Sequence, residues 1–185
     1  MTRKELQQAV RVLRAGGIVA YPTESCFGLG CDPRYKHSLR NLIRLKGRSW
    51  EKGLLLISDR CERLAHYVDW PDTTIQQQVN ASWPGPFSWA LPARKGVSRW
   101  LRGRHASVVV RVTAHPPARA LCQQLGGALV STSANRHGRP AARSAAMVQR
   151  EFRGQVDYIL PGKIGAMTRP SEIRDAISGA IIRPA

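Results

Sequence analysis

The spacing of apolar residues near the N-terminus predicts an amphipathic helix. Leu6, Val10 and Leu13 recur at intervals that place them on one helical face. Thr2 and Glu5 precede this face as a capping-box pattern, in which each side chain can satisfy a free backbone amide at the helix start. A pair of glycines follows Leu13 closely, so we expect the helix to end there.

Short apolar runs and amphipathic segments alternate along the rest of the chain. Ile18 to Tyr21 predicts a buried strand, and Pro22 predicts a loop after it because proline lacks the amide proton that a central strand needs. The apolar spacing from Leu39 to Lys46 predicts a second helix. Further strands are predicted at 53–57, 87–91, 107–112, 128–131, 158–160 and 180–183, and further helices near 59–67, 72–82, 116–125 and 144–152. This interleaving, without repeats or linkers, predicts an α/β fold around a twisted mixed sheet flanked by helices.

The length of 185 residues fits one domain, 1–185, that buries enough apolar surface to fold without disulfides or a structural metal. The four cysteines form no C-x-x-C pair and have no zinc-like spacing to histidines, so we expect reduced core thiols and no metal ligands. No apolar run is long enough to span a bilayer, and no signal-peptide core is present at the N-terminus. We therefore expect a cytoplasmic protein with no membrane partner.

The charge balance indicates a polyanionic partner. Lysine and arginine number 29 against 12 acidic residues, which gives a formal net charge of +17. No acidic residue lies between Asp72 and Glu151, whereas eleven arginines or lysines do, from Arg94 to Arg150. A basic face of this kind would bind a phosphate backbone in a salt-sensitive manner. The alternative is a general charge surplus that only favours solubility.

Two polar clusters follow predicted elements and could carry chemistry. The first is Y-P-T-E-S-C-F-G-L-G at 21–30, where hydroxyls and a carboxylate follow a buried strand and two glycines permit close backbone approach. The second comprises Lys46 and Arg48, with Lys52 just beyond them. These cations suit a triphosphate, but they could also serve only to complement the C-terminus of a helix.

A third cluster and a neighbouring strand present polar side chains on shared faces. In an extended chain Ser131, Ser133 and Asn135 point to one side, and so do Ser107 and Arg111 in a run otherwise made of valine. A buried arginine requires an anion nearby, either a carboxylate of this chain or a ligand. These residues therefore predict a site for a small anionic ligand.

Common nucleotide-binding motifs are absent from the sequence. It contains neither a Gly-x4-Gly-Lys-Ser/Thr loop nor a Gly-x-Gly-x-x-Gly fingerprint. His115, which precedes two prolines, predicts a helix start rather than a catalytic base, and the W-P-G-P segment at 83–86 predicts a rigid turn with a half-buried indole. Any ATP site must be of a different kind.

Six ordered motifs resemble the YrdC/TsaC family of threonylcarbamoyl-AMP synthases over nearly the whole chain. They are Y-P-T-E-S-C-F-G-L-G, K-G-R, W-P-G-P-F-S, V-R-V-T-A-H-P, S-T-S-A-N and P-S-E-I-R-D. The resemblance implies a YrdC-like fold with a concave basic cleft. It also implies that L-threonine, bicarbonate and ATP, with Mg²⁺ accompanying the nucleotide, give threonylcarbamoyl-AMP and pyrophosphate. A separate threonylcarbamoyltransferase complex would then modify adenosine 37 of tRNA.

The resemblance also assigns expected roles to individual residues. The catalytic set would be Lys46, Arg48, Ser133 and Asn135, which match the family's K-x-R and S-x-N motifs. The same four would bind ATP together with Lys52, Ser107 and Arg183. L-threonine would lie among Thr23, Ser25, Arg111, Ser131 and Ser171, with Arg111 facing its carboxylate.

Two departures and two alternatives accompany this resemblance. Ser49, followed by Trp50, replaces the usual proline after K-x-R, and Ser25 replaces a frequent threonine. The resemblance therefore does not fix the geometry of the phosphate loop. The chain is similar to the short, single-domain members, which lack an additional C-terminal domain. One alternative is a non-catalytic YrdC-like protein that binds tRNA or ribosomal RNA. The other is the carbamoyl-adenylate domain of hydrogenase-maturation carbamoyltransferases, whose zinc-finger and acylphosphatase-like regions are absent here.

Overall fold

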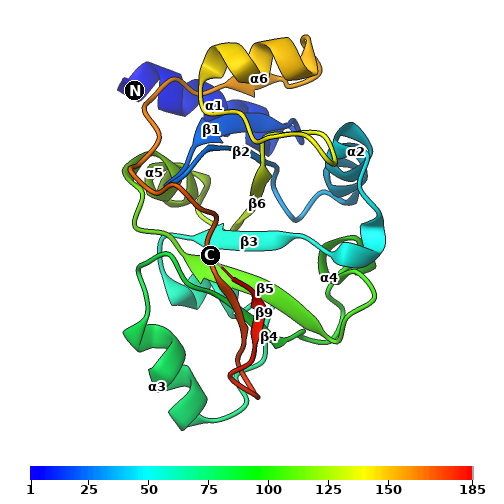
Figure 1. Ribbon diagram of the computed structural model, residues 1–185, viewed down its shortest axis with the longest axis vertical. Coiled ribbons are helices and arrows are strands. Elements are labelled where there is room, and N and C mark those ends of the chain that lie inside the picture. Colours follow the sequence, from blue (N-terminus) through cyan, green and yellow to red (C-terminus); the bar gives the residue numbers. More distant parts are fainter. Residues whose placement is uncertain (185) are drawn as a thin grey trace.

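A nine-stranded mixed sheet runs through the part of the chain described by the computed structural model, residues 1–184 (Figure 1). The strand order is β7-β1-β2-β6-β3-β5-β4-β8-β9, with parallel pairs β1/β7, β3/β5 and β4/β8 among antiparallel ones. The strands are β1 (Val19–Pro22), β2 (Phe27–Gly30), β3 (Leu55–Ser58), β4 (Ser88–Pro92), β5 (Ser107–Val112), β6 (Leu129–Ser133), β7 (Tyr158–Ile159), β8 (Ile173–Asp175) and β9 (Ile181–Arg183). The predicted mixed α/β sheet is confirmed.

Helices flank the sheet as the alternating pattern predicts. They are α1 (Arg3–Arg14), α2 (Lys36–Lys46), α3 (Thr73–Ala81), α4 (Arg99–Arg102), α5 (Pro116–Leu125) and α6 (Ala145–Phe152), with the short 3-10 helices η1 (Trp50–Lys52) and η2 (Cys61–Leu64). The capping box at Thr2 and Glu5 is formed. His115 is the N-cap of α5, with prolines in its first turn, so its predicted place at a helix start is confirmed.

Alternation along the strands divides the apolar residues between two packed clusters. Val19 and Tyr21 of β1 pack with α1 and α5, whereas Ala20 packs into the larger cluster on the opposite face. In β5, Val108 and Val110 enter that larger cluster. The face of the sheet that carries α1 and α5 is therefore covered at one end only. The segment between β7 and β8, orange to red in Figure 1, runs from the end of the sheet near α1 and α5 down past β3 and β5.

Several element predictions were wrong for identifiable reasons. Residues 27–30 were expected to lie in a loop but form β2, whose glycines allow it to fit between β1 and β6. A Cβ atom on Gly30 would lie 2.5 Å from the carbonyl oxygen of Val130. The helix predicted near 59–67 is only η2, because the backbone of Tyr67, Val68 and Asp69 bonds instead to the chain around β4. The sequence also did not predict α4 or β8.

The cysteines and the W-P-G-P segment follow their predictions in part. All four cysteines are free, but only Cys31 and Cys122 are buried, whereas Cys26 and Cys61 are partly exposed. The expectation of core thiols was therefore wrong for two of them. Trp83 is half-buried as predicted, and its indole nitrogen donates to the carbonyl of Phe87 at 2.8 Å.

Candidate active site

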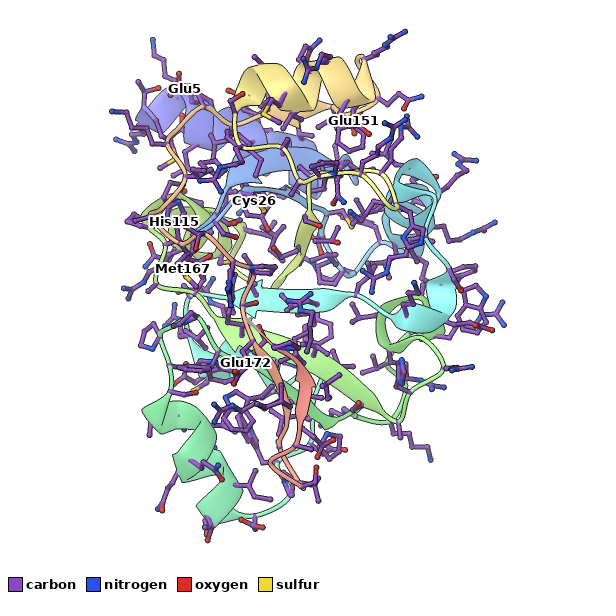
Figure 2. All side chains as sticks on the ribbon, viewed as in Figure 1. Glu5, Cys26, His115, Glu151, Met167 and Glu172 are labelled. Atoms are coloured by element: carbon purple, nitrogen blue, oxygen red, sulfur yellow. The ribbon has the colours of Figure 1, made fainter. Side chains whose placement is uncertain are left out.

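A pocket of about 890 Å³ lies over the uncovered part of the sheet. Its floor comes from β2, β6, β3, β5 and β4, and its walls come from η1, the segment after β6 and the segment before β8. Cys26 and Met167, from two of the lining segments far apart in sequence, both fall in the central region of Figure 2. The pocket therefore gathers residues from the N-terminal, middle and C-terminal parts of the chain.

Every residue predicted for the site lines this pocket except Lys46. Those present are Thr23, Ser25, Arg48, Lys52, Ser107, Arg111, Ser131, Ser133, Asn135, Ser171 and Arg183. Alternation in β5 explains part of the convergence, since Ser107, Val109 and Arg111 face the pocket while the valines between them face the core. Pairing of β3 with both β5 and β6 brings Arg111 and Ser131 to the same floor.

Lys46 lies beneath the Ser133–Asn135 strip rather than on the pocket wall. It is 4% exposed, and its ammonium group donates to the carbonyl of Ser133 and, at 2.8 Å, to that of Asn135. The hydroxyl of Ser133 in turn donates to Asn135 Oδ1 at 2.6 Å. The Asn135 amide nitrogen donates to the carbonyl of Arg139, also at 2.6 Å. Lys46 thus anchors the strip that would present hydroxyl and amide groups to a ligand.

The cations of the site are held close enough to perturb one another. Burial, and then the charge of Arg48, lower the pKa of Lys46 to about 8. Burial, then Arg48 and Arg111, lower the pKa of Arg183. The Nε atom of Arg48 is buried without a hydrogen-bond partner among the described residues. An anionic ligand would relieve this mutual repulsion and satisfy the free donors.

The anion that Arg111 requires is supplied inside the chain by Glu24. The Arg111 guanidinium lies 3.1 Å from Glu24 Oε2, and the hydroxyl of Thr113 donates to Glu24 Oε1 at 2.8 Å. Of the two predicted alternatives, an internal carboxylate is therefore present. Sequence reasoning assigned no role to Glu24, although it is the one acidic residue of the Y-P-T-E-S motif.

Further cations line the pocket that no motif indicated. They are Arg102, Arg143 and Arg169, together with His105. Arg143 donates to the carbonyl of Ser25 at 2.9 Å and so connects the segment after β6 to the β1–β2 turn. Arg102 ends the short helix α4, and the others lie outside the helices and strands, so no common spacing or periodicity identifies them as parts of one site.

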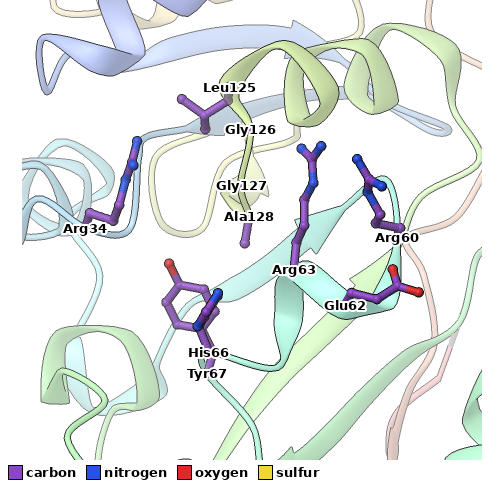
Figure 3. Close-up of a pocket in the computed structure, with 10 residues that line it drawn as sticks. All are labelled: Arg34, Arg60, Glu62, Arg63, His66, Tyr67, Leu125, Gly126, Gly127 and Ala128. Atoms are coloured by element: carbon purple, nitrogen blue, oxygen red, sulfur yellow. The ribbon is translucent and has the colours of Figure 1, made fainter.

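A second pocket of about 350 Å³ lies beside the C-terminus of α5 (Figure 3). Arg34, Arg60 and Arg63 line it together with His66 and Tyr67. These arginines already pair with carboxylates of the chain, Arg34 with Asp32 and the other two with Asp59. The large pocket, where free donors converge, is therefore the stronger candidate for a binding site.

Residues 1–184 show neither a cluster of metal ligands nor a membrane-spanning helix. No group of three or more histidine, cysteine, aspartate or glutamate side chains there could hold a metal ion. Nor does any helix in that range have the length and apolarity to cross a bilayer.

Comparisons with known proteins agree on one family. The model of the Sua5/YciO/YrdC family, described as telomere recombination, matches residues 11–185. A threonylcarbamoyl-AMP synthase of Nitrosococcus oceani is 50% identical over 95% of this chain and 95% of its own length. The corresponding synthase of Halorhodospira halophila is 48% identical over 96% of this chain and 93% of its own.

Solved structures show the same fold. P. abyssi Sua5 with the changes H234A/Y235A superposes with a TM-score of 0.94 at 26% identity over 100% of this chain. P. abyssi Sua5 complexed with L-threonine superposes with a TM-score of 0.88 at 27% sequence identity, and 95% of this chain is covered. This chain spans only 57% and 52% of those two longer chains. E. coli YciO gives a TM-score of 0.85 at 26% identity, with 98% of this chain and 89% of YciO covered.

Proposed function

The chain belongs to the Sua5/YciO/YrdC family, and from that premise we propose that it is a threonylcarbamoyl-AMP synthase formed by one domain, 1–185. L-threonine and bicarbonate give a carbamate and water, and an oxygen of the carbamate forms a bond to the α-phosphorus of ATP. The bond from that phosphorus to the bridging oxygen breaks, and pyrophosphate leaves. The product serves threonylcarbamoylation of adenosine 37 in tRNA.

The observation that carries this proposal is the convergence of hydroxyls, an amide and cations in one pocket. Arg48 and Lys52 come from one segment, Arg111 from β5, Ser133 from β6 and Arg183 from β9, yet all line the same space of about 890 Å³. That volume accommodates a nucleotide and an amino acid together. Relatives 48–50% identical over nearly the whole chain carry the same enzyme name.

Within the pocket we assign one cationic region to the nucleotide. Arg48, Lys52 and Arg183 bind the triphosphate, and Ser107, Ser133 and Asn135 contact the phosphates or the ribose. Phosphoryl transfer of this type depends on positioning and on neutralising charge as pyrophosphate leaves. The lowered pKa values of Arg48 and Arg183, caused first by burial, support a site built to receive negative charge.

Lys46 acts on the same site mainly through the backbone. Its hydrogen bonds to the Ser133 and Asn135 carbonyls support a positioning role, and its buried positive charge lies beneath the phosphates. L-threonine lies on the other side of the pocket, among Thr23, Ser25, Arg111, Ser131 and Ser171. The P. abyssi relative whose structure is complexed with L-threonine supports an amino-acid site in this fold.

Magnesium enters this proposal bound to ATP. Among the described residues that line the pocket, Glu24 is the one carboxylate, and it lies 3.1 Å from the Arg111 guanidinium, so the lining offers no set of carboxylate ligands for Mg²⁺. Mg²⁺ retains several waters and would be held mainly by the phosphates of the nucleotide. No step assigned to this chain passes through the metal.

Pyrophosphate release from ATP by the purified protein tests the proposal. We expect release that requires both L-threonine and bicarbonate, and that disappears when either is omitted. Release that is indifferent to both omissions would contradict the assignment. No release under any condition, together with tight RNA binding, would favour the non-catalytic RNA-binding alternative.

The partner proposed for the outer surface is tRNA, with the threonylcarbamoyltransferase complex receiving the product. Arg40 and Arg99 lie 5.5 and 5.3 Å from the centre of the Trp100 ring, and Arg99 also lies 5.7 Å from the ring of Trp50. Neither arginine has a carboxylate within ion-pair distance in residues 1–184. Arginines stacked on aromatic rings are suited to RNA phosphates and bases. A cytoplasmic location belongs to the same proposal, because ATP and tRNA occur there.

Charge reversal tests this RNA surface. Arg40→Glu with Arg99→Glu should weaken tRNA binding and reduce its salt dependence, while pyrophosphate release stays unchanged. The matched control is Arg119→Glu with Arg150→Glu, which reverses two exposed charges on α5 and α6. An equal loss of tRNA binding in both pairs would show that only total charge matters.

A further inference from the structure

Glu24 is the sole acidic residue among the described residues that line the large pocket. Seven arginines or lysines share the lining with it. A wall of this kind suits phosphates and carboxylates, but it would repel a positively charged group everywhere except at Glu24. The position of this one carboxylate therefore decides where a cationic part of a substrate can bind.

Backbone hydrogen bonds fix the segment that carries Glu24. The turn between β1 and β2 is closed by the amide of Thr23, which donates to the carbonyl of Cys26 at 2.9 Å. From the other side, the amides of Gly165 and Met167 donate to the carbonyls of Thr23 and Glu24 at 2.9 and 3.1 Å. The backbone of Glu24 is thus held by residues more than a hundred positions away in the sequence, separately from the contact between its carboxylate and Arg111.

The Glu24 carboxylate retains free acceptor capacity. A carboxylate offers about four lone-pair sites, and two are occupied, one by Arg111 and one by the hydroxyl of Thr113. The Glu24 side chain is 15% exposed, and that exposure is toward the pocket it lines. The Nε atom of Arg111 is also free, since it is buried without a partner among the described residues. Glu24 therefore offers free acceptor sites to a ligand, and the neighbouring Arg111 offers a free donor.

We propose that Glu24 binds the α-ammonium group of the amino-acid substrate while Arg111 binds its α-carboxylate. The Glu24–Arg111 pair then acts as a receptor for a zwitterion, in which each charge of the ligand meets its opposite. This inference rests on the proposed function and deepens it, because it names the group that selects an α-amino acid over the corresponding acid without the α-amino group. The nitrogen keeps one N–H after it becomes a carbamate, so it can still donate to Glu24.

The test compares two ligands that differ only in the amino group. L-threonine and 3-hydroxybutyrate, which is threonine without its α-amino group, are titrated into the wild-type protein and into Glu24→Gln by calorimetry. Glutamine preserves the size of the side chain and removes its charge. We expect L-threonine to bind about 10- to 100-fold more weakly to the variant, the range for loss of a charge-assisted hydrogen bond. Binding of 3-hydroxybutyrate should change by less than about 3-fold.

The control is Glu172→Gln, which makes the same substitution in a residue that pairs with Arg174 outside the pocket lining. ATP affinity, expected to stay unchanged, confirms that each variant is folded. Should Glu24→Gln not fold, Thr113→Val removes one hydrogen bond from the Glu24 carboxylate. This variant is expected to weaken binding of L-threonine but not of 3-hydroxybutyrate, and by less than the loss expected for Glu24→Gln. Equal weakening of both ligands would mean that Glu24 only holds Arg111, and this would overturn the proposal. So would unchanged L-threonine binding. Both results leave threonine-dependent pyrophosphate release by the wild type, and hence the proposed function, intact.

Discussion

ATP binding near pH 8 should be accompanied by proton uptake at Lys46. Burial, and then the charge of Arg48, lower the pKa of Lys46 from the usual value of 10.5 to about 8. As the pH rises through about 8, the ligand-free protein loses the charge on this ammonium group. A triphosphate above the Ser133–Asn135 strip favours the charged form and raises the pKa again. Binding must therefore restore the proton that the free protein has lost.

The structure sets the size of the effect. A shift from 10.5 to about 8 corresponds to about 3 kcal/mol in favour of the neutral amine in the free protein. If bound ATP offsets this shift, about half a proton is taken up per ATP at pH 8, and about 0.1 proton at pH 7. Uptake should increase further toward pH 9, where histidines contribute little.

Calorimetric titration with ATP in buffers of different ionisation enthalpy measures this uptake directly. Lys46→Arg is the matched variant, because arginine stays charged throughout this range and should bind ATP without taking up a proton. Lys46→Met should instead lose the hydrogen bonds to the Ser133 and Asn135 carbonyls. It should bind ATP poorly and be less stable by about 1–3 kcal/mol for the unsatisfied carbonyls. No uptake by the wild type at pH 8, or the same uptake by Lys46→Arg, would refute the placement of Lys46 beneath the phosphates.

Two further predictions separate the pocket from other surfaces. Arg48→Ala should abolish synthesis in a pyrophosphate assay yet leave tRNA retention on filters largely intact, because the eleven cations of the acid-free span remain. Loss of both together would place RNA in the pocket itself. Gly165→Ala should raise the KM for L-threonine and spare ATP, since its new Cβ would lie 2.6 Å from the carbonyl oxygen of Glu24. Gly127→Ala, whose Cβ would have no atom within 4 Å, is the control, and an equal effect there would contradict the argument.

Local patterns in the sequence predicted most of the elements because their causes are local. The capping box and apolar spacing of α1, the prolines that begin α5 and the valines of β5 each act over a few residues. The prediction that Ser107 and Arg111 share a face was correct for the same reason, since side chains alternate along a strand. Ser131, Ser133 and Asn135 also line the pocket together as predicted, but Thr132 lines it too, so alternation alone does not explain this strip.

The contacts that complete the site depend on strand order, which no local pattern contains. Arg111 and Glu24 are 87 positions apart, and they meet because the sheet order β1-β2-β6-β3-β5 brings the β1–β2 turn and β5 to the same pocket. The glycines of β2 obscured that strand, since they lack the side chains on which alternation is recognised, although their small size is what allows β2 to fit. Lys46 was expected at the phosphates because its motif is basic. Its burial under the Ser133–Asn135 strip follows from packing of α2 against the sheet.

Charge divides the pocket into two regions that meet at Arg183. Arg48 and Lys52 provide positive charge alone, whereas Arg111 is balanced by Glu24. The pKa of Arg183 is lowered by burial and then by both Arg48 and Arg111, so its guanidinium is close enough to experience both regions. Under the proposed roles, the nucleotide occupies the first region and the amino acid the second. The carbamate oxygen and the α-phosphorus must then approach each other near Arg183. A cation is most useful at that point, because negative charge accumulates there as the new bond forms and pyrophosphate departs.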